Sequence, residues 1–136
     1  MKIFICCSKH IYNRISPIKE TLEKTGHIIT LPNSYDVPMK EEEMKKIGAE
    51  EHKNWKASML RLQKEKVEKN DALLVLNMEK NGQKNYIGGA TFLEIFMAFE
   101  LGKKIYLFNP ITDSLLKDEL LGMGPIIING NLGLIK

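Results

Sequence analysis

Short apolar runs that alternate with segments of helical periodicity are the feature that most constrains the fold of this chain. The clearest run, Ala72–Leu76, is apolar at every position, as in a strand that is buried on both faces of a sheet. Further strands are predicted at Ile3–Cys7, His27–Leu31, Lys104–Phe108 and Pro125–Ile128. Because helical segments separate these strands, the pattern predicts β-α-β units and a parallel sheet.

Helix signals mark the segments between the strands. Ser16 is placed to cap a helix over Ser16–Lys24, a proline follows in its first turn, and Gly26 lies just beyond its end. The segment Asn33–Met39 is predicted to be a loop. Further helices are predicted over Lys40–Lys69 in two pieces that break near Gly48, over Thr91–Leu101, and over Asp113–Leu121.

The surroundings of these helices are also predicted. Thr91–Leu101 is apolar nearly all round and should be well buried. Trp55 is expected at a helix–helix contact, and the lysines of Lys40–Lys69 are most simply a solvated face.

The predicted fold class is α/β: a single-domain, doubly wound, flavodoxin- or Rossmann-like sheet of five parallel strands in the order 2-1-3-4-5. A length of 136 residues fits one domain spanning residues 1–136. In such sheets ligands bind beyond the carboxyl ends of the strands, at the point where the strand order reverses. We therefore expect the site near residues 7–10, 77–89 and 109–110.

Composition excludes several classes of protein. The net charge of +3 arises from 20 basic and 17 acidic residues that are interspersed, so a nucleic acid polymer is not an expected partner. The two cysteines, Cys6 and Cys7, are adjacent and should point to opposite faces of a strand, and the chain has no metal-ligand motif. No apolar run approaches the ~20 residues of a membrane span. We expect a cytoplasmic protein without a metal or organic cofactor.

The stretch from Gly88 to Glu94 carries the strongest chemical signal. Two glycines, Gly88 and Gly89, let a backbone approach a ligand closely and adopt positive φ, and the following helix N-terminus suits an anion. We expect Gly88, Gly89 and the Thr91 N–H to approach the sugar or phosphate of a ligand. Glu94 is predicted in the first helical turn, where its carboxylate can attack an anomeric carbon or stabilise an oxocarbenium-like charge. The spacing Thr91-x-x-Glu94 fits a capping box equally well.

This region resembles the core of the nucleoside 2-deoxyribosyltransferases. The resemblance rests on Asn70–Leu76, the glycine loop, Thr91–Glu94 and Ala98–Lys104. It implies that Glu94 is the nucleophile that takes the deoxyribosyl group. The segment Phe4–His10 is similar to the deoxynucleoside 5′-monophosphate N-glycosidases of the same superfamily, which implies that Ser8 helps to hold a 5′-phosphate. The resemblance also implies a homodimer or higher homo-oligomer, in which a neighbouring subunit completes each site.

The chain departs from the family pattern at four positions. Gln63 and Gly88 stand where many members carry aspartates, which orient the substrate and donate protons to the leaving group. Ala90 and Cys7 stand where members carry glycines. The loop also resembles the Gly-Gly-x-Gly-Thr-x-x-Glu motif of cytokinin-activating phosphoribohydrolases, with one residue fewer. These departures weaken the prediction of transferase activity more than the prediction of fold.

Further polar residues are predicted at the ligand-binding edge of the sheet. Lys9 and His10 follow the first strand and are candidates for contact with a phosphate or a ribose hydroxyl, although a solvated turn explains them as well. Asn77 and Asn109 end two strands and are candidates for binding a base, although asparagine often ends strands as a turn former. Tyr35 is a candidate for stacking on a base, or for packing over the sheet edge.

Two functions follow from these patterns. The first is cleavage or transfer at the N-glycosidic bond of a nucleoside or nucleoside 5′-monophosphate, a small-molecule partner, with Glu94 at the reacting carbon. The enzyme would then be an N-glycosidase or a nucleoside deoxyribosyltransferase. The alternative is a non-catalytic nucleotide-binding or sensing module of the same fold, which the exchanges at Gln63 and Gly88 favour.

Overall fold

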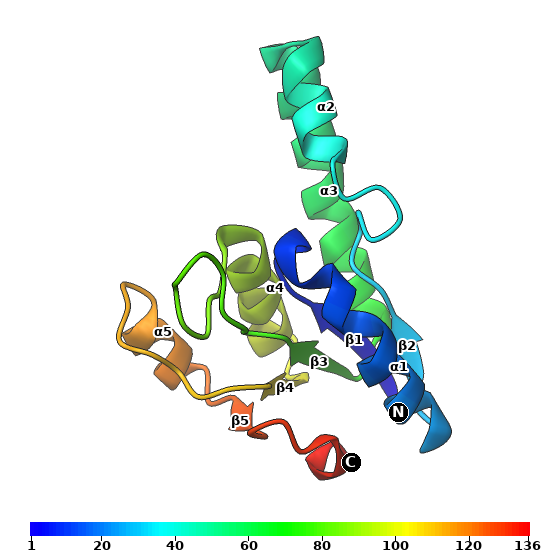
Figure 1. Cartoon of the computed structure of the whole chain (residues 1–136), viewed down its shortest axis with the longest axis vertical. Helices are drawn as coiled ribbons and strands as arrows, with labels where there is room; N and C mark the ends of the chain where they lie inside the picture. Colours follow the sequence, from blue (N-terminus) through cyan, green and yellow to red (C-terminus); the bar gives the residue numbers. More distant parts are fainter.

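A parallel sheet of five strands in the order β2-β1-β3-β4-β5 forms the centre of the computed structural model, which describes residues 1–136 (Figure 1). The strands are β1 (Lys2–Cys6), β2 (Ile28–Thr30), β3 (Ala72–Val75), β4 (Lys104–Leu107) and β5 (Ile126–Ile127). Every neighbouring pair is parallel. The predicted fold class and strand order are confirmed.

Helices cover both faces of this sheet. They are α1 (Ile15–Lys24), α2 (Lys40–Ile47), α3 (Ala49–Lys69), α4 (Gly89–Glu100), α5 (Lys117–Gly122) and the 3₁₀ helices η1 (Lys9–Arg14) and η2 (Leu132–Leu134). One core joins the sheet to α1, η1 and the carboxyl-terminal segment, and the other joins it to α3, α4 and α5. None of these helices combines the length and the apolar character that a membrane span requires.

The two central strands, β1 and β3, define the functional edge of the sheet, which is the edge at which the site is predicted. β1 and β3 pair in register, with Cys6 opposite Val75, so the chain leaves both strands at the same edge of the sheet. Cys6 and Cys7 belong to the cores on opposite faces, which confirms that consecutive side chains diverge here. The loops after β1 and β3 therefore meet beyond the carboxyl ends of the strands.

The start of α1 differs from the prediction. The helix follows η1 without a break, so Ser16 lies inside the helix and caps nothing. Instead, the Ser8 hydroxyl caps η1 by accepting a hydrogen bond from the His10 N–H at 3.4 Å. η1 was not predicted, because Ile11 is its only buried residue and leaves no periodic pattern. Gly26 ends α1 with φ +92°, as expected.

Helix α4 is less covered than its apolar sequence suggests. Its buried residues are Thr91, Glu94, Ile95 and Ala98. Leu93, Phe96 and Phe99 are instead 44–46% exposed, so the prediction that this helix is well buried was wrong for one of its faces. The face that packs on the sheet therefore includes a carboxylate, whereas an apolar face remains exposed.

The α2–α3 hairpin extends beyond the sheet. Figure 1 shows both helices at the top of the view, where α2 and the first half of α3 project past the body of the molecule. The two helices pack on each other, and the far end of α3 contacts α4 and β1. As predicted, the chain reverses at Gly48. The hairpin thus stands beside the functional edge and forms a wall there.

Candidate functional site

A cavity of about 300 Å³ lies at the predicted edge of the sheet. The end of β1 contributes Cys7, Ser8, Lys9 and His10, and the loop and helix after β3 contribute Gly88, Gly89, Thr91 and Glu94. The α2–α3 hairpin forms the opposite wall. The structure therefore brings together seven of the residues that the sequence nominated.

Glu94 lies in the second turn of α4, not in the first turn as predicted. The helix begins at Gly89, two residues before the predicted start, and Gly88 is its N-cap with extended backbone at φ −83° and ψ 174°. Thr91 is therefore a helical residue, and no side chain caps the helix. The capping-box interpretation of Thr91 and Glu94 is wrong. The carboxyl group of Glu94 is thus not used at its own helix end.

The first turn of α4 offers unpaired N–H groups to the cavity. The first main-chain hydrogen bond runs from the Phe92 N–H to the Gly88 carbonyl at 2.9 Å. The N–H groups of Gly89, Ala90 and Thr91 consequently have no partner within the helix, and the helix dipole adds partial positive charge there. This end of the cavity therefore suits an oxyanion or a phosphate.

Neither glycine before Glu94 has the positive φ that the sequence suggested. Gly88 has φ −83°, and Gly89 is an ordinary helical residue. A Cβ at Gly88 would lie 3.1 Å from the Tyr86 hydroxyl, whereas a Cβ at Gly89 would meet no atom within 4 Å. Gly89 is exposed and lines the cavity, so its backbone is accessible to a ligand and packing does not require glycine there.

Burial dominates the electrostatics of Glu94. Its side chain is 5% exposed, and this burial raises the pKa of the carboxyl group from 4.5 to about 7. Donor groups on Gln63 and Cys6, and the positive charge of Lys66, oppose the rise. Near neutral pH the carboxyl group therefore exchanges between its acid and its carboxylate forms, which suits a group that must become nucleophilic.

Lys66 and Gln63 approach this carboxyl group from α3. The Lys66 ammonium donates to the Leu31 carbonyl at 2.8 Å and lies 5.7 Å from the centre of the Phe4 ring. It forms no ion pair with a surface carboxylate, and its own pKa is lowered by burial. Gln63 donates from Nε2 to the Ala90 carbonyl at 3.3 Å, which leaves its buried Oε1 unpaired.

The two cysteines are thiols at this site, not thiolates. Burial and the nearby charge of Glu94 raise the pKa of Cys7 to about 12 and raise that of Cys6 well above its ordinary value. Cys7 lines the cavity, where its side chain takes up volume that a glycine would leave open. Its protonated state makes it a wall of the site and not a nucleophile.

Three nominated residues lie outside the cavity. Asn77 is fully buried, and its side chain forms two hydrogen bonds with the backbone of Asn109. The Asn109 N–H donates to Asn77 Oδ1 at 2.8 Å, and Asn77 Nδ2 donates to the Asn109 carbonyl at 2.7 Å. Tyr35 packs on the ring of Tyr12, with 5.7 Å between the ring centres. The structure therefore gives Asn77 and Asn109 a role in joining adjacent strand ends, and Tyr35 a role in packing.

The residues after β1 have partners within the protein. Lys9 forms an ion pair with Glu42 of α2, which ties η1 to the hairpin. Ser8 accepts the capping bond in η1, and its hydroxyl hydrogen remains available as a donor to the cavity. His10 is exposed at the cavity mouth. Ser8 thus keeps a donor for the cavity, whereas Lys9 is paired with Glu42 and His10 is exposed.

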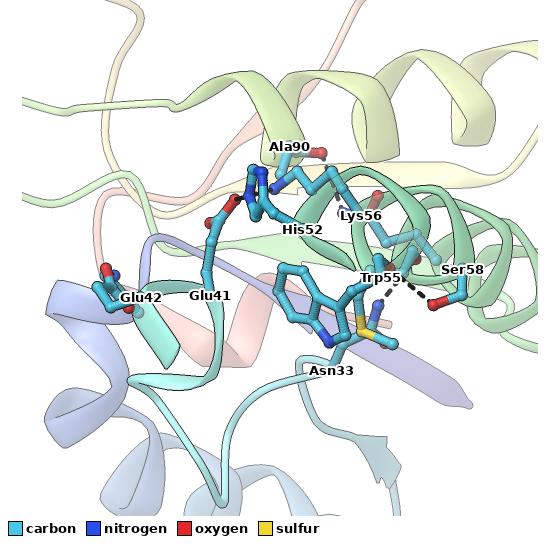
Figure 2. A network of polar contacts seen from close by, with 11 residues as sticks. Asn33, Glu41, Glu42, His52, Trp55, Lys56, Ser58 and Ala90 are labelled. Carbon is cyan, nitrogen blue, oxygen red and sulfur yellow. Dashed lines mark hydrogen bonds and ion pairs between the residues drawn. The ribbon is translucent and has the colours of Figure 1, made fainter. Parts of the chain in front are cut away.

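The hairpin contributes cavity residues that the sequence did not nominate. Glu41 Oε2 accepts hydrogen bonds from His52 Nε2 at 3.0 Å and Lys56 Nζ at 3.2 Å, and Figure 2 shows the three side chains converging above the Trp55 ring. Burial favours a higher pKa for Glu41, but the bonds from His52 and Lys56 outweigh it and the net pKa is lowered. Trp55, which was expected at a helix–helix contact, lines the cavity.

A cation–π pair closes another side of the cavity. Lys80 Nζ lies 4.5 Å from the centre of the Tyr86 ring, and both residues line the cavity. Lys80 forms no ion pair with an acidic side chain, so its charge is available to a ligand. No group of three or more His, Cys, Asp or Glu side chains is arranged to hold a metal ion.

The fold is similar to that of a CMP N-glycosidase from Clostridium botulinum, BcmB. The two structures superpose over 95% of this chain and 90% of that chain, with a TM-score of 0.57 and 16% sequence identity. At this identity the likeness establishes the fold alone. No protein-family model matches the chain, and no curated protein matches its sequence. Membership of the deoxyribosyltransferase-like superfamily accordingly stays a prediction.

Proposed function

We propose that the protein cleaves the N-glycosidic bond of a nucleoside 5′-monophosphate or nucleoside, or transfers its glycosyl group, with Glu94 as the group that meets the anomeric carbon. One observation carries the proposal: a buried carboxyl group with a pKa of about 7 lines a cavity beside a helix N-terminus and Ser8. The similar fold of a protein whose name describes cleavage of CMP supports it.

The proposed chemistry needs no group beyond the chain and water. The Glu94 carboxylate attacks the anomeric carbon, the bond from that carbon to the base nitrogen breaks, and the base leaves with the bonding electron pair and takes a proton from solvent. A water molecule then attacks the same carbon, loses a proton and releases the carboxylate. If Glu94 only stabilises the oxocarbenium-like charge, water attacks directly and the products are the same.

Gln63 cannot act as a general acid for the departing base. Its amide cannot donate a proton as a carboxylic acid does, and it lies where many members of the resembled family carry an aspartate. Protonation of the base must therefore come from water or from the cavity mouth. We expect slow turnover compared with an enzyme that has a general acid in this position.

Positive charge at one end of the cavity favours a phosphorylated substrate. The free N–H groups at the start of α4 lie on the cavity that Glu94 lines, and the charge of Lys80 lies over Tyr86, whose hydroxyl approaches Gly88. Ser8 adds a hydroxyl donor to the same cavity. We therefore expect nucleoside 5′-monophosphates to be better substrates than the corresponding nucleosides.

The test is release of free base from ribo- and deoxyribonucleosides and their 5′-monophosphates, measured by chromatography. We expect release from at least one monophosphate by the wild-type protein, and none above background by Glu94→Ala. Glu100→Gln is the matched control, because Glu100 ends the same helix and is exposed. Equal base release by wild type and Glu94→Ala would overturn the mechanism.

A nucleotide sensor without catalysis is the second candidate. The amide of Gln63 beside Glu94, in place of an acid, favours it. A sensor would gain thermal stability from a nucleotide that it leaves intact. A rise in Tm with a monophosphate that is recovered unchanged after prolonged incubation would support this function over the first.

A further inference from the structure

The cavity has a second end whose chemistry differs from that around Glu94. The α2–α3 hairpin supplies Glu41, Trp55 and Met59 to this end, and Asn33 faces them from the loop after β2. A flat aromatic ring, an apolar side chain and fixed polar groups are what a heterocycle needs from its binding site. The glycosidic bond would then lie between this end and Glu94.

Glu41 is held as a hydrogen-bond acceptor in this wall. His52 and Lys56 both bond to its Oε2, so the bonds fix the carboxylate and leave Oε1 without a partner. The side chain is 28% exposed and lines the cavity, so a ligand can reach it. An ionised carboxylate accepts hydrogen bonds and donates none.

Trp55 is fixed beside this acceptor. The His52 ring stacks on it with 6.2 Å between ring centres and an interplanar angle of 29°, so one histidine orients both the carboxylate and the indole (Figure 2). On the other side, Asn33 donates from Nδ2 to the Met59 carbonyl at 3.0 Å, which leaves its Oδ1 unpaired as well. Lys56 Nζ lies 5.9 Å from the centre of the Trp55 ring, so the carboxylate acceptor of Glu41 and an ammonium donor stand side by side next to the ring.

We propose that this end of the cavity binds the base of the substrate, and that Glu41 selects bases bearing an exocyclic amino group, such as cytosine or adenine, over their oxo counterparts. The inference rests on the proposed function. An amino group donates to Glu41 Oε1, and Lys56 has further N–H donors for the neighbouring ring nitrogen. A carbonyl oxygen in the same place would face a carboxylate, leaving two acceptors opposed and unpaired.

Two matched substrate pairs test the selection: the 5′-monophosphates of cytidine and uridine, and those of adenosine and inosine. We expect kcat/KM to favour the amino member of at least one pair by about tenfold or more. In Glu41→Gln the ratio should fall to within about threefold, because the amide donates to the oxo base and accepts less strongly from the amino base. Glu43→Gln, on the same helix and outside the cavity, should keep the wild-type ratio.

Binding to Glu94→Gln protein separates this inference from the proposed function. Calorimetric titration with the same monophosphates measures base preference without turnover. Preference for the amino member that Glu41→Gln removes would support the base subsite even if no base is ever released. Equal affinity for both members in the presence of Glu41, or a preference unchanged by Glu41→Gln in a variant that melts like wild type, would overturn it, whether or not base release is seen.

Discussion

Replacing Glu94 with glutamine should stabilise the protein in a pH-dependent way. The folded protein raises the pKa of Glu94 from 4.5 to about 7 by burial, so folding disfavours the ionised form. At about 1.4 kcal/mol per pKa unit, this rise corresponds to about 3 kcal/mol of unfolding free energy. Glutamine keeps the shape of the side chain and removes the charge, so it removes this cost.

The sign follows from proton linkage. Below pH 4.5 the carboxyl group is protonated in both the folded and the unfolded states, and its ionisation costs nothing. Between pH 4.5 and about 7 the unfolded chain releases the proton while the folded chain keeps it, so the wild type loses stability as pH rises. Above pH 7 both states are ionised and the difference stays constant.

Urea unfolding of wild type and Glu94→Gln between pH 4 and pH 8.5 measures this difference. The gain in unfolding free energy from the substitution should increase by about 3 kcal/mol across the range, with a midpoint between the two pKa values. Glu100→Gln should show no such increase, because Glu100 is exposed. A difference between wild type and Glu94→Gln that does not change with pH would refute the reasoning.

Three further results are expected. If Glu94 reacts as a carboxylate, kcat/KM for base release should rise with pH through about 7. The Lys66 charge lowers the pKa of Glu94, so Lys66→Met should move this rise to higher pH, whereas Lys66→Arg should leave it in place. Gly89→Ala should leave the unfolding free energy unchanged or increase it by up to about 1 kcal/mol, because the added Cβ meets no atom within 4 Å. It should still lower kcat/KM if a ligand approaches the Gly89 backbone closely, and unchanged kcat/KM would contradict that approach. Asn77→Ala should lower the unfolding free energy by about 3 kcal/mol in urea titrations, because it leaves the N–H and carbonyl of Asn109 unpaired; a loss below about 1 kcal/mol would contradict the structural role.

The order of the sheet was predictable because its signals are local. The run Ala72–Leu76 is apolar throughout, and alternation of strands with helices leaves few parallel topologies. The same rules predicted a site at the carboxyl edge, where Ser8 and Glu94 line one cavity. The identity of this edge depends on topology alone, so errors of a few residues in helix bounds did not displace it.

Helix starts were less predictable, because several residues compete for the cap. Thr91-x-x-Glu94 fits a capping box, but the extended backbone at Gly88 lets the helix begin two residues earlier. Ser16 has the composition of a cap, but η1 runs directly into α1 and leaves it no free helix end. In both cases the preceding backbone, which the sequence does not reveal, decides the start.

The hairpin wall of the cavity was missed for a different reason. A polar side chain at helical spacing looks the same whether it faces bulk water or a polar cavity, so Lys56 was interpreted as part of a solvated face and Glu41 was not singled out. One usable signal was present: His52 and Lys56 are four residues apart and thus share a face of α3 with Trp55 nearby. Aromatic and titratable residues on one face of an otherwise polar helix deserve testing as a site.

The central claim is that the Glu94 carboxyl group faces the ligand cavity with a pKa near neutrality. Carbon-13 NMR titration of the glutamate carboxyl groups measures this directly, with the signal assigned by its loss in Glu94→Gln. The account predicts a midpoint at pH of about 7 that shifts when a nucleoside 5′-monophosphate is added. A midpoint near 4.5, or one that no nucleotide changes, would contradict it.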